Sequence, residues 1–385
     1  MNSLTNRIRI ARDYLGRRAL CDGMPIEFSI ELTSRCNLKC IMCPRDDNAE
    51  RGLGNMKMET FQRIIDQASQ YLEFTYLHLA GEPLMHPQFG EFIEYAASKG
   101  IQTGISTNGT ILDRRRAEIL INSKLADLII SIDGEDRETY RRIRGADSFR
   151  KVVENAETFL QMKRAAGRGP YTVMQMIVMN ENAHQAKQFY RHWKQLGADA
   201  VRLKRFFNFA GNVEDRSVNQ PKLVQLTNGN GNGTGQSASS TGQGNGTGQS
   251  ASSAGNGNGT GVKKKIVLQA ESGRRQPCFL LWRQMAFYYD GTAVSCCHDF
   301  LHESVLGNIH QQTLEEIWNS PVMVDMRRKH LEGRQHEIPL CAGCNQPTVS
   351  VPEVLGATLL NASVTKKALI AVERMARLAG IQTPY

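Results

Sequence analysis

Seven of the nine cysteines fall into two groups whose spacing suits metal binding. The first group is in TSRCNLKCIMCPR, as Cys36, Cys40 and Cys43. Thiolates this close in sequence are typical ligands of zinc or of an iron–sulfur cluster. No fourth cysteine or histidine lies nearby in the sequence, so three ligands leave one coordination position open. An open position is where a substrate or cofactor binds, which predicts a catalytic metal centre.

The pattern Cys-x3-Cys-x2-Cys, placed just after the first expected strand, resembles the motif of the radical S-adenosylmethionine (SAM) superfamily. The resemblance implies a [4Fe-4S] cluster on these three cysteines, with SAM bound at the fourth iron. It also implies reductive cleavage of SAM to a 5′-deoxyadenosyl radical that abstracts a substrate hydrogen atom. Met42 stands where the family usually has an aromatic residue. A structural zinc knuckle or three unrelated core cysteines remain alternatives.

Four more cysteines lie in the C-terminal part at Cys278, Cys296, Cys341 and Cys344. Their spacing resembles the auxiliary-cluster domains of the superfamily, called SPASM and the shorter twitch domain. The resemblance implies a second [4Fe-4S] cluster with four protein ligands, although four thiolates also make a closed structural zinc site. The family's Gly-x4-Cys spacing selects Cys296 as the ligand and leaves Cys297 spare. Cys297 is then either a buried thiol or a hydrogen-atom donor to a substrate radical.

Short β-rich runs alternate with amphipathic helical patterns before residue 228. We expect six strands, at Ile26–Leu32, Phe74–Leu79, Gln102–Ile105, Asp127–Ile132, Thr172–Met179 and Ala200–Phe206. Helical patterns lie between them, near Met58–Tyr71, Phe89–Ser98, Asp113–Ser123, Ser148–Arg164 and Ala183–Leu196. Six units are too few for a complete eight-stranded barrel. The six units indicate an α/β fold with a parallel sheet, open or curled into a partial barrel. The family resemblance implies a partial (βα)6 barrel of the radical SAM type with a small C-terminal α+β iron–sulfur domain.

Composition and motifs divide the chain into five segments. Residues 228–261 hold only Gly, Asn, Ser, Thr, Gln and Ala, which predicts a disordered, flexible linker. The other segments are an N-terminal helical extension at 1–25, the radical SAM core at 26–227, the auxiliary cluster domain at 262–350 and a C-terminal helix at 351–385. Within the auxiliary domain we expect a hairpin around Asp290-Gly291 and one helix near Leu314–His330.

Polar residues follow the carboxyl ends of the expected strands, where functional residues gather in parallel α/β folds. After the second strand, Ala80-Gly81-Glu82-Pro83 resembles the family's Gly-Gly-Glu-Pro element. The resemblance implies that Gly81 lets the backbone approach the methionyl part of SAM and that Glu82 accepts a hydrogen bond from its ammonium group. An ordinary Gly-Pro turn is the alternative.

Further polar candidates follow the third and fourth strands. Ser106 and Asn108 are candidates for binding the ribose hydroxyls or the carboxylate of SAM. Asp133 is a candidate for accepting a hydrogen bond from the ribose or from the substrate. The segment from Tyr140 to Gly145 resembles a family element, which implies that Arg144 pairs with the SAM carboxylate. Turn signals and a solvated helix-end arginine would explain the same residues.

The fate of the substrate radical depends on further groups. An auxiliary cluster that accepts an electron favours oxidation of a small polar substrate, such as a sugar, cyclitol or alcohol. The cysteine spacing also resembles radical SAM dehydrogenases that oxidise 2-deoxy-scyllo-inosamine. Arg202 and Lys204 on the sixth strand are candidates for orienting an anionic or polyol substrate, with a desolvated lysine as base. An epimerase, with Cys297 as donor, and a peptide- or protein-modifying maturase are the alternatives.

Composition limits the remaining classes. The net charge of +9 favours anionic ligands, and no run of apolar residues is long enough for a membrane span. The N-terminus lacks the apolar core of a signal peptide, so we expect a cytoplasmic protein without a membrane or nucleic-acid partner. The family resemblance implies a low-potential electron donor such as a flavodoxin or ferredoxin. A zinc-stabilised scaffold or nucleic-acid binder is the non-enzyme alternative.

Overall fold

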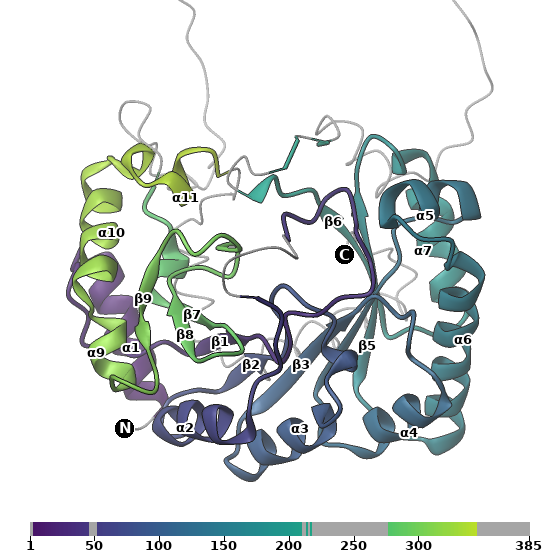
Figure 1. The fold of residues 1–385 in the computed structure, drawn as a ribbon, viewed down its shortest axis with the longest axis horizontal. Coiled ribbons are helices and arrows are strands. Elements are labelled where there is room, and N and C mark those ends of the chain that lie inside the picture. The colour runs from purple at the N-terminus through teal and green to yellow at the C-terminus, as the bar shows by residue number, and fades with distance from the viewer. Residues whose placement is uncertain (1–2, 46–51, 210–212, 215, 218–275, 345–385) are drawn as a thin grey trace, which may run out of the picture.

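The computed structural model describes residues 3–45, 52–209, 213–214, 216–217 and 276–344. The expected linker at 228–261 and the C-terminal helix at 351–385 lie outside these residues. One sheet runs in the order β6-β5-β4-β3-β2-β1-β7-β8-β9 (Figure 1). Its strands are β1 (Glu27–Ile30), β2 (Phe74–Tyr76), β3 (Gln102–Thr107), β4 (Asp127–Ser131), β5 (Tyr171–Val178), β6 (Ala200–Arg205), β7 (Gln284–Phe287), β8 (Thr292–Val294) and β9 (Val305–Asn308).

The six N-terminal strands pair in parallel, each with its neighbour in the chain, which confirms the expected βα units. Figure 1 shows the helices outside a curved sheet. The helices are α1 (Ser3–Leu15), α2 (Met58–Ala68), α3 (Phe89–Ser98), α4 (Arg114–Asn122), α5 (Arg137–Arg144), α6 (Phe149–Ala166), α7 (Ala186–Gln195), α9 (Leu314–Trp318), α10 (Pro321–Glu332) and α11 (Pro339–Ala342). Among the described residues, every helix is too short or too polar to span a membrane.

The two faces of the sheet differ in chemistry because successive side chains of a strand point to opposite sides. The outer face packs against the helices in one apolar core, with Phe28, Ile105, Leu128 and Met174 fully buried. The opposite side, which we call the inner face, carries mostly polar side chains. They include Glu27, Ser29, Tyr76, Ser106, Ser131, Gln175, Arg202 and Lys204, with the apolar Phe74, Ile129, Val173 and Ile177 between them. The curved sheet therefore presents a polar surface on its side away from these helices.

The C-terminal segment continues the same sheet. Strand β7 pairs in parallel with β1, and β8 and β9 follow antiparallel, which confirms the small C-terminal antiparallel unit and its hairpin at Gly291. The core of this segment merges with that of the N-terminal part, since Phe287 packs edge-on against Phe28. The single helix expected over 314–330 is wrong, because Pro321 starts a new helix, α10, after α9.

Candidate active site

The loop with the first three cysteines, residues 33–45, follows β1 and is called the cysteine loop here. The backbone N–H of Glu82 donates to the carbonyl of Arg35 at 2.8 Å. A Cβ atom on Gly81 would overlap the carbonyl oxygen of Thr33, so only glycine allows this contact. The sequence predicted that Gly81 makes room for SAM, and the structure shows that it makes room for the cysteine loop.

The other side of the cysteine loop contacts the end of α5. The amide of Ile41 donates to the carbonyl of Ile143 at 2.9 Å. Gly145 caps α5 with a φ of 70°, and a Cβ there would lie 2.5 Å from the carbonyl oxygen of Lys39. Backbone contacts from two separate elements thus fix the loop that presents the thiols.

Two side-chain donors point at the sulfur atoms of the cysteine loop. Asn108 Nδ2 lies 3.9 Å from Cys36 Sγ, and Arg144 Nη1 lies 3.8 Å from Cys40 Sγ. Burial raises the pKa of the Cys36 thiol, and it raises the pKa of Cys43 to about 11. Half-buried thiols with donors aimed at two of them fit metal-bound thiolates, since a metal deprotonates its cysteine ligands and nearby donors stabilise the sulfur charge.

The spacing of these sulfur atoms favours a cluster over a single ion. Thiolates bound to one zinc at about 2.3 Å lie within about 4.6 Å of each other. Among the described residues, the group of three potential ligand atoms within 4.8 Å is Cys296, Cys297 and His298, and the cysteine loop does not form one. The cysteine loop therefore fits a polynuclear iron–sulfur centre better than a single zinc ion.

Glu82 connects the ends of β2 and β3. Its carboxylate accepts hydrogen bonds from Thr107 Oγ1 at 2.7 Å, from the Asn108 amide at 2.7 Å and from the Leu84 amide at 3.2 Å. Burial raises its pKa, and these donors oppose that effect. Both oxygens are thus engaged within the chain, so Glu82 positions Asn108 beside Cys36, and its contact with SAM stays a prediction.

Asp133 and Arg144 form a buried pair beside the cysteine loop. Asp133 accepts from the Ile177 amide at 2.7 Å, and its other oxygen lies 2.8 Å from Arg144. The Nε of Arg144 and the hydroxyl of Tyr140 are buried without a hydrogen-bond partner among the described residues. Buried unpartnered donors are costly, so they suit an oxygen-rich ligand such as the carboxylate of SAM.

Ser106 is hydrogen-bonded to His78, a histidine that the sequence analysis did not single out. The Ser106 amide donates to His78 Nδ1 at 3.0 Å, and its hydroxyl lies 3.4 Å from that of Ser131. Burial and the charge of Lys204 lower the pKa of His78 to about 4. A neutral imidazole that accepts at Nδ1 carries its proton on Nε2. The sequence did contain a signal for His78: side chains alternate along a strand, so His78, two residues after the inward-facing Tyr76, is expected on the inner face.

The sixth strand brings Lys204 to the same region. Burial and the neighbouring Arg202 lower the pKa of Lys204, while Cys297 and Asp133 oppose them. Its ammonium lies 5.6 Å from the centre of the Phe207 ring. Arg202 itself is exposed. Of the residues predicted to face substrate, the structure therefore places Lys204 within electrostatic range of Cys297 and leaves Arg202 at the solvent.

The second group of cysteines has a different environment. Cys278, Cys296 and Cys341 pack against the apolar core, and the Cys344 amide donates to the carbonyl of Cys341 at 3.3 Å. The sulfur of Cys297 instead accepts a hydrogen bond from Gln284 Nε2 at 3.3 Å. Cys296 and Cys297 also lie with His298 in one group of potential ligand atoms, so the choice of Cys296 as the cluster ligand stays a prediction.

Comparison with known protein families decides between the enzyme and the scaffold. Residues 30–192 match the model of the radical SAM superfamily, and residues 278–345 match that of an iron–sulfur cluster-binding domain, SPASM. The chain belongs to the radical SAM superfamily. As a radical SAM enzyme with a SPASM domain, it uses a [4Fe-4S] cluster with SAM and an auxiliary iron–sulfur cluster.

Curated relatives match this radical SAM chain over part of their length. It is 29% identical over 181 residues to a tungsten-containing aldehyde ferredoxin oxidoreductase cofactor-modifying protein of Pyrococcus furiosus, covering 45% of this chain and 49% of that protein. It is 32% identical over 166 residues to the mycofactocin maturase MftC of Mycobacterium ulcerans, covering 43% of each. The chain thus spans about half the length of the curated relatives it matches.

Solved structures share the fold at low sequence identity. The structure of anSMEcpe with bound AdoMet covers 90% of this chain and 99% of its own, with 16% identity and a TM-score of 0.58. SuiB of Streptococcus suis bound to the precursor peptide SuiA covers 79% and 67%, with 15% identity and a TM-score of 0.57. BtrN in complex with AdoMet and 2-DOIA covers 85% and 96%, with 17% identity and a TM-score of 0.50. These likenesses confirm the fold class.

Proposed function

We propose that this enzyme oxidises a hydroxyl-bearing carbon of a small polar substrate and passes one electron to the auxiliary cluster. The observation that carries the proposal is the polar inner face of the sheet, which extends from the strands beside the cysteine loop to those beside Cys297. A surface with carboxylate, phenol, imidazole, amide and ammonium groups suits a polyol or an anion better than an apolar ligand. The groups belong to Glu27, Tyr76, His78, Gln175, Lys204 and Gln284.

The two clusters take ligands from different elements in this proposal. The cluster that binds SAM uses the cysteine loop, and the auxiliary cluster uses the cysteines after residue 276. The proposed ligands are Cys36, Cys40 and Cys43 for the first cluster, and Cys278, Cys296, Cys341 and Cys344 for the second. When bound, SAM and its cluster supply the radical that removes a hydrogen atom from the substrate carbon.

Residues around the cysteine loop bind SAM directly or hold those that do. Arg144 Nε and the Tyr140 hydroxyl, both buried without a described partner, bind the carboxylate end of SAM. Asp133 fixes Arg144 from the other side. Ser106 is half-buried on the inner face, where its hydroxyl suits a ribose contact. Asn108 is held by Thr110 and Asn37, so it supports Cys36.

Lys204 is the base in this proposal. Loss of the C–H hydrogen atom leaves a radical on the hydroxyl-bearing carbon. The O–H proton would then move to neutral Lys204 as a C=O bond forms. The auxiliary cluster that Cys278, Cys296, Cys341 and Cys344 would hold would supply the acceptor for the remaining electron. His78 Nε2–H donates to the same substrate oxygen as its charge develops, which is the role of a fixed neutral donor. Burial favours the neutral form of Lys204 that this step needs.

Deuterium transfer tests the substrate class. The anaerobically reconstituted enzyme, with SAM and dithionite, is incubated with carbon-deuterated polyols, cyclitols and aminocyclitols, and separately with deuterated peptides. We expect deuterium in 5′-deoxyadenosine, together with a ketone or aldehyde product, in a small-molecule arm. Transfer from peptides alone would replace the proposal with the maturase alternative, a class to which mycofactocin maturase MftC belongs by name.

Epimerisation is a second candidate because Cys297 is held by Gln284 on β7 and lies within electrostatic range of Lys204. A thiol there can return a hydrogen atom to the opposite face of a substrate radical. In D2O an epimerase places solvent deuterium on the product carbon, since the thiol hydrogen exchanges with solvent. The oxidase forms a carbonyl compound and incorporates none at that carbon. Replacement of Cys297 by Ser stops only the first outcome.

A further inference from the structure

His330 on α10 bridges two cysteines of the second group. The amide of Cys278 donates to its Nδ1 at 3.2 Å, and its Nε2 lies 3.4 Å from the sulfur of Cys341. The imidazole is only 3% exposed. Cys278 and Cys341 lie far apart in the sequence. His330 therefore links the start of the proposed auxiliary-cluster segment directly to its end.

The hydrogen bonds fix the tautomer of His330. A backbone N–H is always a donor, so Nδ1 must accept and cannot carry a proton of its own. The neutral ring then bears its proton on Nε2, which makes it a donor to Cys341 Sγ. An N–H donor stabilises the negative charge on a cluster thiolate. It therefore favours the reduced cluster, which carries one more electron.

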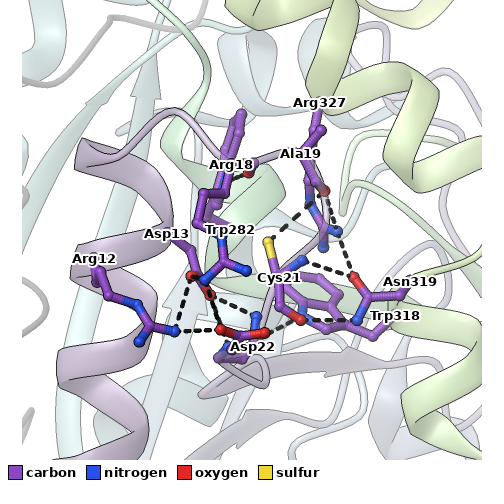
Figure 2. A network of polar contacts seen from close by, with 11 residues as sticks. Arg12, Asp13, Arg18, Ala19, Cys21, Asp22, Trp282, Trp318, Asn319 and Arg327 are labelled. Carbon is purple, nitrogen blue, oxygen red and sulfur yellow. Dashed lines mark hydrogen bonds and ion pairs between the residues drawn. The ribbon is translucent and has the colours of Figure 1, made fainter.

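The helix that carries His330 is anchored at one position. Three residues earlier, Arg327 is fully buried and donates through Nε to the carbonyl of Leu281 at 2.8 Å. Its Nη1 donates to the Ala19 carbonyl and to Asn319 Oδ1, both at 3.1 Å (Figure 2). The guanidinium also stacks 4.2 Å from the centre of the Trp318 ring. Residues i and i+3 share a helix face, so this anchor sets the direction of His330.

The N-terminal segment completes the anchor. Figure 2 shows Arg18, Ala19 and Cys21 beside Trp282 and Arg327. Trp282 Nε1 donates to the Arg18 carbonyl at 2.8 Å. Tyr14 donates to the carbonyl of Pro277, the residue before Cys278, at 2.9 Å. The residues that precede β1 thus hold both α10 and the backbone beside Cys278, so the imidazole meets its two partners in a fixed geometry.

We infer that His330 is a positioning residue of the auxiliary cluster, which clamps Cys278 to Cys341 and raises the reduction potential of the cluster through its Nε2–H donor. The inference rests on the proposed auxiliary ligands. A higher potential makes the cluster a better acceptor for the electron that the substrate releases. The donor thus contributes to the direction of electron flow, away from the substrate, although His330 touches no reacting atom.

The test uses the full chain with Cys36, Cys40 and Cys43 all changed to Ala, so that only the auxiliary cluster forms. Iron is counted, and the midpoint potential is measured by anaerobic redox titration followed by electron paramagnetic resonance. His330→Leu is expected to keep about four irons and to shift the reduction equilibrium about tenfold toward the oxidised cluster, about 59 mV for one electron. His330→Gln restores an N–H donor and most of the potential, and His336→Leu, an exposed control, changes neither.

The outcomes separate the inference from the proposed function. A parent variant without iron overturns the proposed auxiliary ligands, and the inference with them. Four irons and an unchanged potential in His330→Leu overturn the inference alone. Loss of iron in His330→Gln also overturns it, because His330 would then be a ligand rather than a donor to one. If His330→Leu loses iron and His330→Gln keeps it, the Gln variant decides. A midpoint potential equal to that of the parent then supports a hydrogen bond from residue 330 to the cluster thiolate.

Discussion

The two cysteine groups differ in what surrounds their sulfur atoms. Around the cysteine loop, polar groups face the thiols, and Arg144 Nε and the Tyr140 hydroxyl are buried without a described partner. In the second group, Cys278, Cys296 and Cys341 pack against the apolar core, and His330 ties two of them together. A centre that exchanges a ligand needs polar groups that the ligand satisfies, whereas a closed centre is completed by the protein itself.

The largest effect expected from this contrast comes from removing one ligand of each group. Cys36→Ala abolishes 5′-deoxyadenosine formation, because the SAM cluster loses a ligand. Cys341→Ala spares SAM cleavage but stops product formation, since the substrate electron has no acceptor. Each variant falls from about eight irons per chain to about four. If Cys36→Ala still forms 5′-deoxyadenosine, Cys36 is not a ligand of the SAM cluster. If Cys341→Ala still forms product, the auxiliary cluster is not the electron acceptor.

A glycine tests whether packing of the cysteine loop matters as much as its ligands. Gly81→Ala forces a Cβ into the backbone of the loop, so we expect loss of the SAM cluster, retention of the auxiliary cluster and about 1–3 kcal/mol of destabilisation. Iron analysis and chemical denaturation measure both effects. Gly90→Ala in α3 is the control, because its Cβ would meet one atom, Ile119 Cγ2 at 2.9 Å, and the exposed Ile119 side chain can move toward solvent. Full iron content in Gly81→Ala would show that the loop adjusts.

Sequence reasoning predicted the strands correctly and proposed the two cysteine groups, because alternation and spacing are local signals. It could not find the partners of the strand-end residues. Glu82, predicted to bind SAM, is engaged by Thr107 and Asn108, residues that lie 25 and 26 positions away. His78 and His330 act through contacts with a neighbouring strand and with distant cysteines, and neither stands in a motif. Pairings that depend on which strands become neighbours do not show in the spacing of single residues.

The proposed base gives a smaller effect that separates the two halves of the reaction. Lys204→Met is expected to lower product formation about a hundredfold, while deuterium transfer into 5′-deoxyadenosine changes little, because proton loss follows abstraction. In the parent, burial lowers the pKa of Lys204, so activity is lost below that pKa and rises with pH at values where an ordinary lysine is still charged. The ratio of product to 5′-deoxyadenosine across pH measures this. Arg205→Met, on the same strand, serves as the control, and an unchanged ratio in Lys204→Met would exclude the lysine.

The smallest expected effect concerns the buried donors beside the cysteine loop, which distinguish this group of cysteines from the second one. Tyr140→Phe removes a buried hydroxyl that has no partner among the described residues, so it should leave stability unchanged or slightly higher. The same change should weaken SAM binding about tenfold, since a hydrogen bond to a charged carboxylate is worth about 1.5 kcal/mol or more. Tyr95→Phe is the matched control, because the Tyr95 hydroxyl donates to Asp66 at 2.8 Å on the surface, and its loss should not affect SAM. Anaerobic equilibrium dialysis and thermal unfolding give both quantities. Lower stability of Tyr140→Phe with unchanged SAM affinity would mean that the hydroxyl already has its partner within the chain.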